Sequence, residues 1–313
     1  MLISFLRKYK WSYKVSNFFN RKKLLHNTEL YKKYNLKKNY YSSINSQDFE
    51  GINGQEPIMD REDCAQLLPQ QERFNSLDKK TQDSLLKWSK DGFVILDSFF
   101  QKEEIDLINK EVEELLQAKK IKWSKNRILF AIKKSKLLKS VATFPKLKDC
   151  IELLMAKEMD LFQSINFYES SQQKTHSDSI HMTTFPHGNI IAVWVALQDV
   201  SPEDGPLHYY PGSHKLPYIM NKDFDNQSST FKLGNKSYQD YENKIEQVLQ
   251  ENTHLKKEVF LAKKGDVLIW HANLLHGAQA KINPNALRKS MVFHFYANDA
   301  IAYHEITERP TLK

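Results

Sequence analysis

The sequence predicts an α+β protein in which helices flank an antiparallel double sheet or jelly roll. Apolar residues recur at helical spacing before about residue 160, whereas β-branched and aromatic residues dominate the segments after it. Turn sequences at residues 201–205 and 211–213 separate those later segments. The chain has 313 residues, 41% of them hydrophobic, which is enough to bury a core of this kind.

Three helices and one strand are expected before residue 160. Residues 81–90 form the first helix, which Gly92 ends, and residues 93–96 follow as a strand of four apolar residues. Residues 101–119 carry apolar side chains at helical spacing and acidic residues in the first turn. Residues 147–156 are the third predicted helix.

Six strands are expected after residue 160, because each segment is rich in β-branched and aromatic residues. They are residues 161–168, 190–198, 207–210, 259–261, 267–271 and 289–296. A polar insertion at residues 218–256 interrupts the series, and residues 238–250 within it are expected to be helical. An insertion of this length in a compact β domain is usually either a cover over an active site or disordered.

The net charge of +8 comes from the first 50 residues, which contain eleven Lys and Arg against three acidic residues. The rest of the chain is neutral overall, so no nucleic-acid-binding fold and no nucleic-acid partner are expected. We therefore divide the chain in two. Residues 1–75 are a basic, aromatic-rich arm followed by a polar linker from residue 46, and residues 76–313 are the double-sheet domain with its insertion.

The arm allows two interpretations. Residues 1–45 mix basic with aromatic residues, and Leu2, Phe5, Leu6 and Tyr9 recur at helical spacing. The arm could pack its aromatic side chains on the main domain and leave its lysines in solvent. Alternatively, it could make a peripheral contact with anionic lipid or with a lipid-linked substrate. The sequence leaves both open.

Cysteine usage and hydropathy indicate the compartment. Cys64 and Cys150 are far apart and give neither a disulfide framework nor a zinc-binding spacing. Charge appears at Arg7 and Lys8, before the apolar core of a signal peptide could form. No apolar stretch reaches the roughly 18 residues of a membrane-spanning helix. We therefore expect a cytoplasmic protein with reduced thiols. Nothing in the sequence predicts an oligomeric state.

Candidate metal ligands begin with a His-x-Asp sequence at His176 and Asp178. If this segment is a strand, both side chains point to the same face. A hundred residues later, His276 follows the apolar strand of the run GDVLIWHANLLHG (residues 265–277), and a closed β fold would bring it beside the pair. Two histidines and one carboxylate leave open positions on a metal ion, as in non-haem Fe(II) oxygenases. The same three ligands could also hold catalytic zinc.

A cosubstrate site is indicated twelve residues after His276, at Arg288. Strand alternation places Arg288, Ser290, Val292 and His294 on one face, and Ser290 is a second candidate for binding the cosubstrate. A guanidinium on an apolar face needs an anion, and its planar fork binds a carboxylate through two hydrogen bonds. 2-Oxoglutarate offers a keto acid for the iron and a distal carboxylate for such an Arg. The alternative is a structural ion pair at Arg288.

These motifs resemble the phytanoyl-CoA dioxygenase family of Fe(II)- and 2-oxoglutarate-dependent oxygenases. Besides the His-x-Asp pair, the resemblance is carried by three runs. They are AVWVALQDVSPEDGPLHYYPGSHK (residues 192–215), GDVLIWHANLLHGA (residues 265–278) and RKSMVFHF (residues 288–295). The resemblance extends from about Gly92 to Tyr296 and implies a double-stranded β-helix core, the jelly roll of cupin-like proteins.

The resemblance also implies roles for particular residues. His176, Asp178 and His276 would bind Fe(II). Arg288 would pair with the distal carboxylate of 2-oxoglutarate, and Trp194 would lie against this cosubstrate. Halide-using relatives lack the metal-binding carboxylate, so the presence of Asp178 favours hydroxylation, with O2 consumed and succinate and CO2 released.

Other histidines have alternative interpretations. His181 and His187 follow the His-x-Asp pair closely and either line a pocket or belong to a polar loop. His271 could replace His276 as the third ligand. Arg288 would then lie seventeen residues after the ligand, which is longer than the family pattern, so His276 is preferred.

The expected function is hydroxylation of an unactivated C–H bond in a small-molecule, sugar or lipid-linked metabolite. The basic arm and the insertion at 218–256 fall outside the family pattern, so a fatty acyl-CoA substrate is not carried over. One alternative is a non-catalytic β-helix protein that binds a metabolite or a metal. Another keeps the same oxygenase chemistry but ends in epimerisation, desaturation or ring closure.

Overall fold

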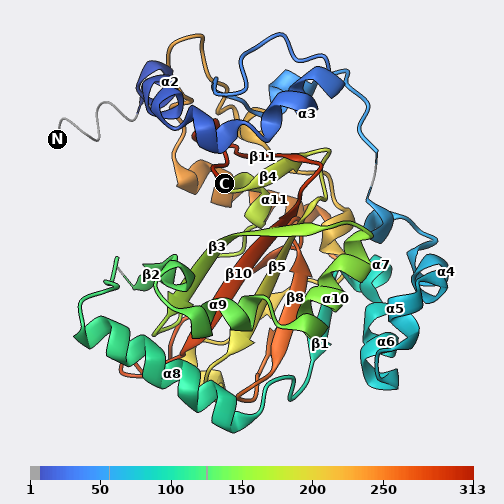
Figure 1. Ribbon diagram of the computed structural model, residues 1–313, viewed down its shortest axis with the longest axis vertical. Helices are drawn as coiled ribbons and strands as arrows, with labels where there is room; N and C mark the ends of the chain where they lie inside the picture. The colour runs from blue at the N-terminus through green and yellow to red at the C-terminus, as the bar shows by residue number, and fades with distance from the viewer. Residues whose placement is uncertain (1–7, 56, 125) are drawn as a thin grey trace.

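A six-stranded antiparallel sheet forms the centre of the protein (Figure 1). The computed structural model describes residues 8–55, 57–124 and 126–313. The strand order of the large sheet is β1-β8-β5-β10-β3-β2. These strands are β1 (Phe93–Leu96), β2 (Arg127–Leu129), β3 (Met159–Phe167), β5 (Ile190–Ala196), β8 (Val267–His271) and β10 (Ser290–Ala297).

Two smaller sheets have the strand orders β7-β6-β9 and β12-β11-β4. Their strands are β4 (Thr183–Phe185), β6 (Leu207–Tyr209), β7 (Glu258–Phe260), β9 (His276–Ala278), β11 (Ile301–His304) and β12 (Arg309–Pro310). Side chains of the β7-β6-β9 sheet, such as Leu207 and Phe260, share one apolar core with Trp194 and Leu268 of the large sheet. Two sheets packed face to face in this way form the predicted jelly roll.

Helices cover the other face of the large sheet (Figure 1). Alternate residues of β5, including Ile191, Val193 and Val195, pack with apolar side chains of these helices. The residues between them face the core shared by the two sheets, so every residue of β5 is buried. The helices are α8 (Lys102–Gln117), α9 (Lys136–Ala142) and α10 (Pro145–Met155). Among the residues that the structure describes, no helix is both long and apolar enough to cross a bilayer.

Most predicted elements are confirmed, with small shifts at their ends. The helix expected at residues 81–90 is instead two short helices, α6 (Lys79–Leu85) and α7 (Trp88–Asp91), and Gly92 ends the second with a φ of 77°. The insertion contains the expected helix as α11 (Tyr238–Glu251). Short 3-10 turns connect the strands: η5 (Ala131–Lys133), η6 (Asp178–Ile180), η7 (Pro202–Asp204), η8 (Ser213–Lys215) and η9 (Asn221–Phe224).

The segment at residues 46–75, expected to be a linker, is largely built of short helices that pack on the rest of the protein. They are η2 (Ser46–Phe49), η3 (Ile58–Asp60), α4 (Cys64–Leu67), η4 (Leu68–Gln70) and α5 (Glu72–Asn75). The segment is polar overall, but it contains isolated apolar residues, such as Met59, Leu68 and Phe74, that are buried in the main core. Because these anchors do not follow a regular period, the sequence pattern did not reveal them.

The basic arm forms α2 (Lys10–Phe19), η1 (Arg21–Leu24) and α3 (Asn27–Lys33). Tyr31 of α3 and the later residue Phe49 share a core with Phe185 of β4 and Tyr303 of β11, as the packing interpretation expects. In Figure 1 the arm lies at the end of the molecule opposite α8. The helical spacing predicted from Leu2, Phe5 and Leu6 lies outside the described residues.

Candidate metal centre

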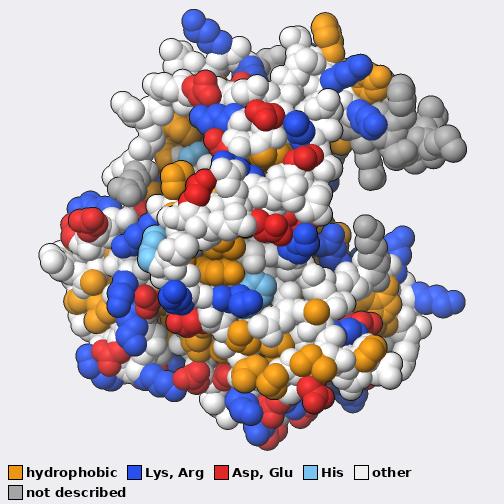
Figure 2. Space-filling view, turned by 180° about the vertical axis from the view of Figure 1, so that it is seen from behind, with side chains coloured by type: hydrophobic (Ala, Val, Ile, Leu, Met, Phe, Trp, Pro, Cys, Tyr) orange, Lys and Arg blue, Asp and Glu red, His pale blue; other side chains and the backbone are white. Residues whose placement is uncertain are grey.

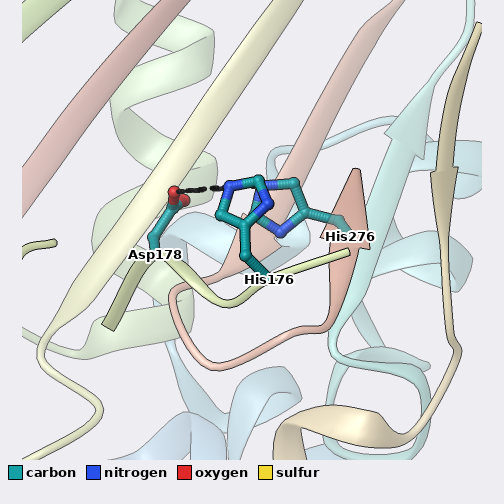
Figure 3. Close-up of side chains that lie close together, drawn as sticks. All are labelled: His176, Asp178 and His276. Atoms are coloured by element: carbon teal, nitrogen blue, oxygen red, sulfur yellow. Dashed lines mark ion pairs between the residues drawn. The ribbon is translucent and has the colours of Figure 1, made fainter. Parts of the chain in front are cut away.

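His176, Asp178 and His276 meet at one point, with their side chains facing one another (Figure 3). Their ligand atoms all lie within 4.8 Å of one another, and all three residues are buried. His176 Nε2 is 3.9 Å from Asp178 Oδ1, and His276 Nε2 is 3.8 Å from the same oxygen. The three predicted ligands are thus brought together in a set that fits a metal ion of the non-haem iron type.

Backbone pairing places the two histidines side by side. The His176 N–H donates to the His276 carbonyl and the His276 N–H donates to the His176 carbonyl, both at 2.9 Å. Asp178 is not in a strand, because it begins the 3-10 turn η6. The expectation that a strand aligns His176 with Asp178 is therefore wrong, and the turn that follows the backbone bridge directs the carboxylate toward the imidazoles.

Backbone carbonyls hold both imidazoles in the orientation that metal binding requires. His176 Nδ1 is 2.8 Å from the carbonyl of Lys174, and His276 Nδ1 is 2.9 Å from the carbonyl of Leu274. A carbonyl can only accept, so each Nδ1 carries the hydrogen and donates it. This tautomer leaves the lone pair on Nε2, the nitrogen that faces Asp178 in both rings.

Trp270 orients the carboxylate, since its indole N–H donates to Asp178 Oδ2 at 2.9 Å. Burial alone raises the pKa of Asp178, but the nearby His276 and His294 outweigh burial and hold that pKa below its ordinary value. The carboxylate is therefore ionised at neutral pH. Burial, followed by the nearby His276, lowers the pKa of His176 to about 3, so this ring is neutral and can ligate a metal.

The three residues line a cavity of about 260 Å³. Its walls include residues of β2, β3, β5, β8 and β10 of the large sheet, residues of β6 and β9 of the facing sheet, and His304 of β11. Apolar side chains such as Ile165, Leu207 and Val292 line part of it. Polar side chains of Gln163, Gln173 and other residues line the rest, so the cavity offers both apolar contact and hydrogen bonding to a small ligand.

Arg288 lines the same cavity and is 2% exposed. Within the part of the chain that the structure describes, no carboxylate forms an ion pair with its guanidinium, and Nε and Nη1 have no hydrogen-bond partner. The structural ion pair considered from the sequence is thus not formed. Burial lowers the pKa of Arg288 to about 10, which leaves the group protonated at neutral pH. A buried, charged and unpartnered guanidinium fits the carboxylate of a ligand such as 2-oxoglutarate.

Trp194 and Ser290 differ in their relation to the cavity. Trp194 lines it, and the centre of its ring is 5.9 Å from Arg288 Cζ. Ser290 is fully buried on the β10 strand, and its hydroxyl has no hydrogen-bond partner, but its side chain is not part of the cavity wall. A cosubstrate role of either residue remains a prediction.

His294, for which the sequence predicted no role, lies directly beside the three candidate ligands. His294 Nε2 is 3.6 Å from Asp178 Oδ2, the residue is buried, and neither ring nitrogen has a partner at hydrogen-bond distance. The strand alternation that singled out Arg288 also places His294 on the same face, and that signal could have identified it. Trp270 was missed as well, because an indole N–H gives no sequence motif for the carboxylate that it will contact.

The other three histidines considered from the sequence differ in their position relative to the cavity. His181 lines the cavity, whereas His187 stacks on Tyr218 with 4.5 Å between ring centroids and is not part of the wall. His271, the alternative third ligand, lies apart from the candidate metal centre. The Asn273 N–H donates to His271 Nδ1 at 2.9 Å, and His271 Nε2 is 3.0 Å from Asp60 Oδ1, so the ring faces Asp60 and not the candidate ligands.

The insertion packs directly against the segment that carries the candidate ligands. The Ser177 N–H donates to the hydroxyl of Tyr241 at 3.0 Å, and Tyr241 and Ile245 of α11 share an apolar cluster with Ile180. The hydroxyl of Tyr238 is 3.1 Å from His181 Nε2 in the cavity wall. Residues 218–256 therefore form a structured element beside the cavity, and mobility of this element remains a prediction.

Comparison with known sequences finds one family and several relatives. A sequence model described as phytanoyl-CoA dioxygenase (PhyH) matches residues 88–290. Ectoine dioxygenase of Sphingopyxis alaskensis is 25% identical over 218 residues, which span 63% of this chain and 70% of that protein. A phytanoyl-CoA dioxygenase domain-containing protein 1 homolog of Dictyostelium discoideum is 26% identical over 279 residues, with 71% of this chain and 92% of that protein covered.

Comparison with solved structures supports the fold. The non-haem α-ketoglutarate-dependent carbocyclase SnoK from nogalamycin biosynthesis aligns with a TM-score of 0.59 and 18% identity, over 74% of this chain and 88% of that chain. EctD from S. alaskensis, solved with 2-oxoglutarate and 5-hydroxyectoine, aligns with a TM-score of 0.54 and 19% identity, over 71% of this chain and 78% of that chain. These likenesses confirm the predicted double-stranded β-helix core.

Proposed function

The chain belongs to the phytanoyl-CoA dioxygenase family, and from this premise we propose that it oxidises a small molecule at an Fe(II) ion held by His176, Asp178 and His276. It is a 2-oxoglutarate-dependent non-haem iron dioxygenase, with Fe(II) as cofactor and 2-oxoglutarate and O2 as cosubstrates. The observation that carries the site assignment is the convergence of this buried ligand set with the unpartnered guanidinium of Arg288 in one cavity.

The residues of the chain have distinct tasks in this proposal. When bound, the iron supplies the activation of O2 that is coupled to decarboxylation of 2-oxoglutarate. His176 and His276 present neutral Nε2 atoms, and Asp178, held by Trp270, supplies the negative charge. Arg288 binds the distal carboxylate of 2-oxoglutarate. Burial of these groups excludes water and strengthens each charged contact.

We propose hydroxylation of an unactivated C–H bond as the reaction outcome, because Asp178 supplies the metal-binding carboxylate that halide-using relatives lack. The substrate class is a small molecule, a sugar or a lipid-linked metabolite. A carbocyclase and an epimerase, SnoK and SnoN, share the fold, so ring closure and epimerisation are the competing outcomes, together with desaturation. Product mass separates hydroxylation from the other outcomes, since hydroxylation adds one oxygen atom, epimerisation leaves the mass unchanged, and ring closure and desaturation each remove two hydrogens.

The test is succinate release by the protein supplied with Fe(II), 2-oxoglutarate and O2, over a panel of candidate substrates, with product mass as a second readout. The matched control is Asp178→Ala, measured with the same panel. Substrate-dependent succinate release by the wild-type protein alone supports the proposal. If the iron-loaded wild-type protein released no more succinate than Asp178→Ala with every candidate, the non-catalytic binding role would replace it.

The cellular setting is also a proposal. Cys64 and Cys150 are both free and buried, which suits a reducing compartment such as the cytoplasm. Peripheral contact of residues 1–45 with a membrane would place the enzyme near a lipid-linked substrate. Cell fractionation of the full chain tests both statements.

A further inference from the structure

Helix α2 has one face fixed to the protein. Asn17 is buried, and its side-chain amide donates to the carbonyl of Tyr41 at 3.0 Å. Lys10 Nζ lies 2.7 Å from Glu308 Oε2, and the Glu308 side chain is almost fully buried. These contacts determine which side of α2 points away from the protein.

The opposite face of α2 is apolar and exposed to solvent. Trp11, Val15, Phe18 and Phe19 are 53%, 49%, 45% and 78% exposed. With about 100° of rotation per residue, their positions fall within a sector of roughly 100° on the helix. Such a stripe normally packs on a core, but here its side chains are exposed to solvent.

The insertion adds a further exposed aromatic residue next to α2. The Lys10 N–H donates to the carbonyl of Phe231 at 2.9 Å, and the Leu233 N–H donates to the carbonyl of Lys8 at 3.0 Å. These bonds hold Phe231, which is 73% exposed, beside the first turn of α2. We call Trp11, Val15, Phe18, Phe19 and Phe231 the apolar face.

Exposed basic residues flank the apolar face along the chain. Residues 8–28 contain no acidic residue. The exposed bases of this segment are Lys8, Lys14, Arg21, Lys22 and Lys23. Figure 2 shows hydrophobic and basic side chains next to one another at the upper right edge of the molecule, the edge at which α2 lies. Other exposed apolar residues lie elsewhere, such as Leu107 on α8 and Ile282 in the loop before β10, as is usual for a protein surface.

We propose that the apolar face docks on the surface of a bilayer that contains anionic phospholipid. Trp and Phe side chains suit the boundary between headgroups and acyl chains, and a rim of Lys and Arg adds attraction to anionic headgroups. A second copy of this chain fits the face less well, because two such rims carry the same charge and repel each other. An amphipathic helix bound in this way lies in the interface and does not span the membrane.

The docking face and the candidate metal centre are separate parts of the protein. None of the residues of the apolar face lines the cavity that contains His176, Asp178 and His276. The inference therefore does not rest on the proposed oxygenase function, and vesicle binding can be measured without any turnover.

The test is cosedimentation of the full chain with vesicles of phosphatidylcholine alone and with vesicles of phosphatidylcholine and phosphatidylserine. The wild-type protein should pellet with the anionic vesicles, and added salt should release it. The double variant Trp11→Ser/Phe19→Ser should lose at least tenfold in partitioning, because both side chains are more than half exposed and would enter the bilayer. The matched control is Ile282→Ser, at a residue that is 72% exposed outside the face, and its binding should be unchanged.

Three outcomes would overturn the proposal. One is equal pelleting of the wild-type protein and the double variant. Another is vesicle binding that salt does not weaken or that neutral vesicles support equally well. The third is a dimer in solution that Trp11→Ser/Phe19→Ser dissociates, without vesicle binding by the wild-type protein, which would assign the face to a second copy of the chain.

Discussion

Arg288 and Glu305 are both buried charged residues, but their surroundings differ. Arg288 has two guanidinium nitrogens without a partner and lines a cavity. Glu305 is fully buried, and its carboxylate accepts hydrogen bonds from the Ser46 N–H at 3.0 Å, the Ser46 hydroxyl at 2.8 Å and the Asn221 N–H at 3.1 Å. Close by in sequence, Glu308 accepts from the side-chain amide of Asn45 and pairs with Lys10.

The difference separates structural charge from charge that awaits a ligand. The partners of Glu305 and Glu308 come from the basic arm, the first residue of the segment that follows it, and the insertion, so these carboxylates connect distant parts of the chain. A buried charge with full hydrogen bonding needs nothing further. A buried charge that lacks such partners, as at Arg288, indicates a place where a ligand of opposite charge completes the site.

The same contrast distinguishes two histidines of one segment and gives the largest expected effect. His276 has a free Nε2 among the candidate ligands, whereas His271 Nδ1 accepts a hydrogen bond from the Asn273 N–H and His271 Nε2 lies 3.0 Å from Asp60 Oδ1. We expect His276→Ala to reduce iron occupancy and succinate release to background, measured by metal analysis and product assay. His271→Ala is the matched control and should keep iron in its folded fraction. Iron retained in His276→Ala but lost in His271→Ala would reverse the assignment.

Removing the unpartnered charge should affect cosubstrate binding and spare the fold. We expect Arg288→Met to raise the KM for 2-oxoglutarate by a factor that corresponds to roughly 2–5 kcal/mol. The ligand-free variant should unfold at the same temperature as the wild-type protein or higher, because an uncompensated buried charge is gone. Addition of 2-oxoglutarate should stabilise only the wild-type protein in a thermal unfolding assay. A large loss of stability in ligand-free Arg288→Met would show that the guanidinium is structural.

Removing a partnered charge should have the opposite result. Glu305→Ala leaves donors of Ser46 and Asn221 without an acceptor, and we expect it to lower the free energy of unfolding by about 1.5–3 kcal/mol. Hydrogen exchange in residues 10–46 should become faster, while the KM for 2-oxoglutarate stays unchanged. Chemical denaturation and exchange mass spectrometry measure these effects. An altered KM with unchanged stability would contradict the division between the two regions.

The smallest expected effect is at Ser290, whose buried hydroxyl has no partner although it is not part of the cavity wall. If it donates to the cosubstrate, Ser290→Ala should weaken binding by roughly 0.5–1.5 kcal/mol and so raise the KM for 2-oxoglutarate about two- to tenfold. Ser290→Cys serves as a control of similar volume with a weaker donor. A KM within error of the wild-type value would remove Ser290 from the cosubstrate site.

The candidate ligands could be predicted because their signals are short in sequence. His176 and Asp178 form a two-residue motif, and alternation along one strand singles out Arg288. The position of His276 in a family pattern resolved the choice against His271, and the contact between His271 and Asp60 explains that choice physically. Local patterns of this kind can identify candidate ligands even where the predicted local geometry is wrong, as it was for the strand expected at Asp178.

Other features depend on contacts between distant segments, which no local pattern encodes. The bond from Trp270 to Asp178 joins residues 92 positions apart, and the one from Asn45 to Glu308 joins residues 263 positions apart. The helices of residues 46–75 were not predicted for the same reason, because the spacing of their buried apolar side chains depends on the surface that they cover. The residues of the candidate site could therefore be predicted from the sequence more readily than the residues that support them.

The carboxylates at Glu305 and Glu308 also bear on how the protein is made. Lys10, Asn45 and Ser46 leave the ribosome before the acceptors that fix them, which are translated more than 250 positions later. The arm therefore cannot reach its final place until residue 308 has been added, even though domains generally begin to fold from the N-terminal side during synthesis. In this chain the first described segment to be synthesised is among the last to be fixed in place.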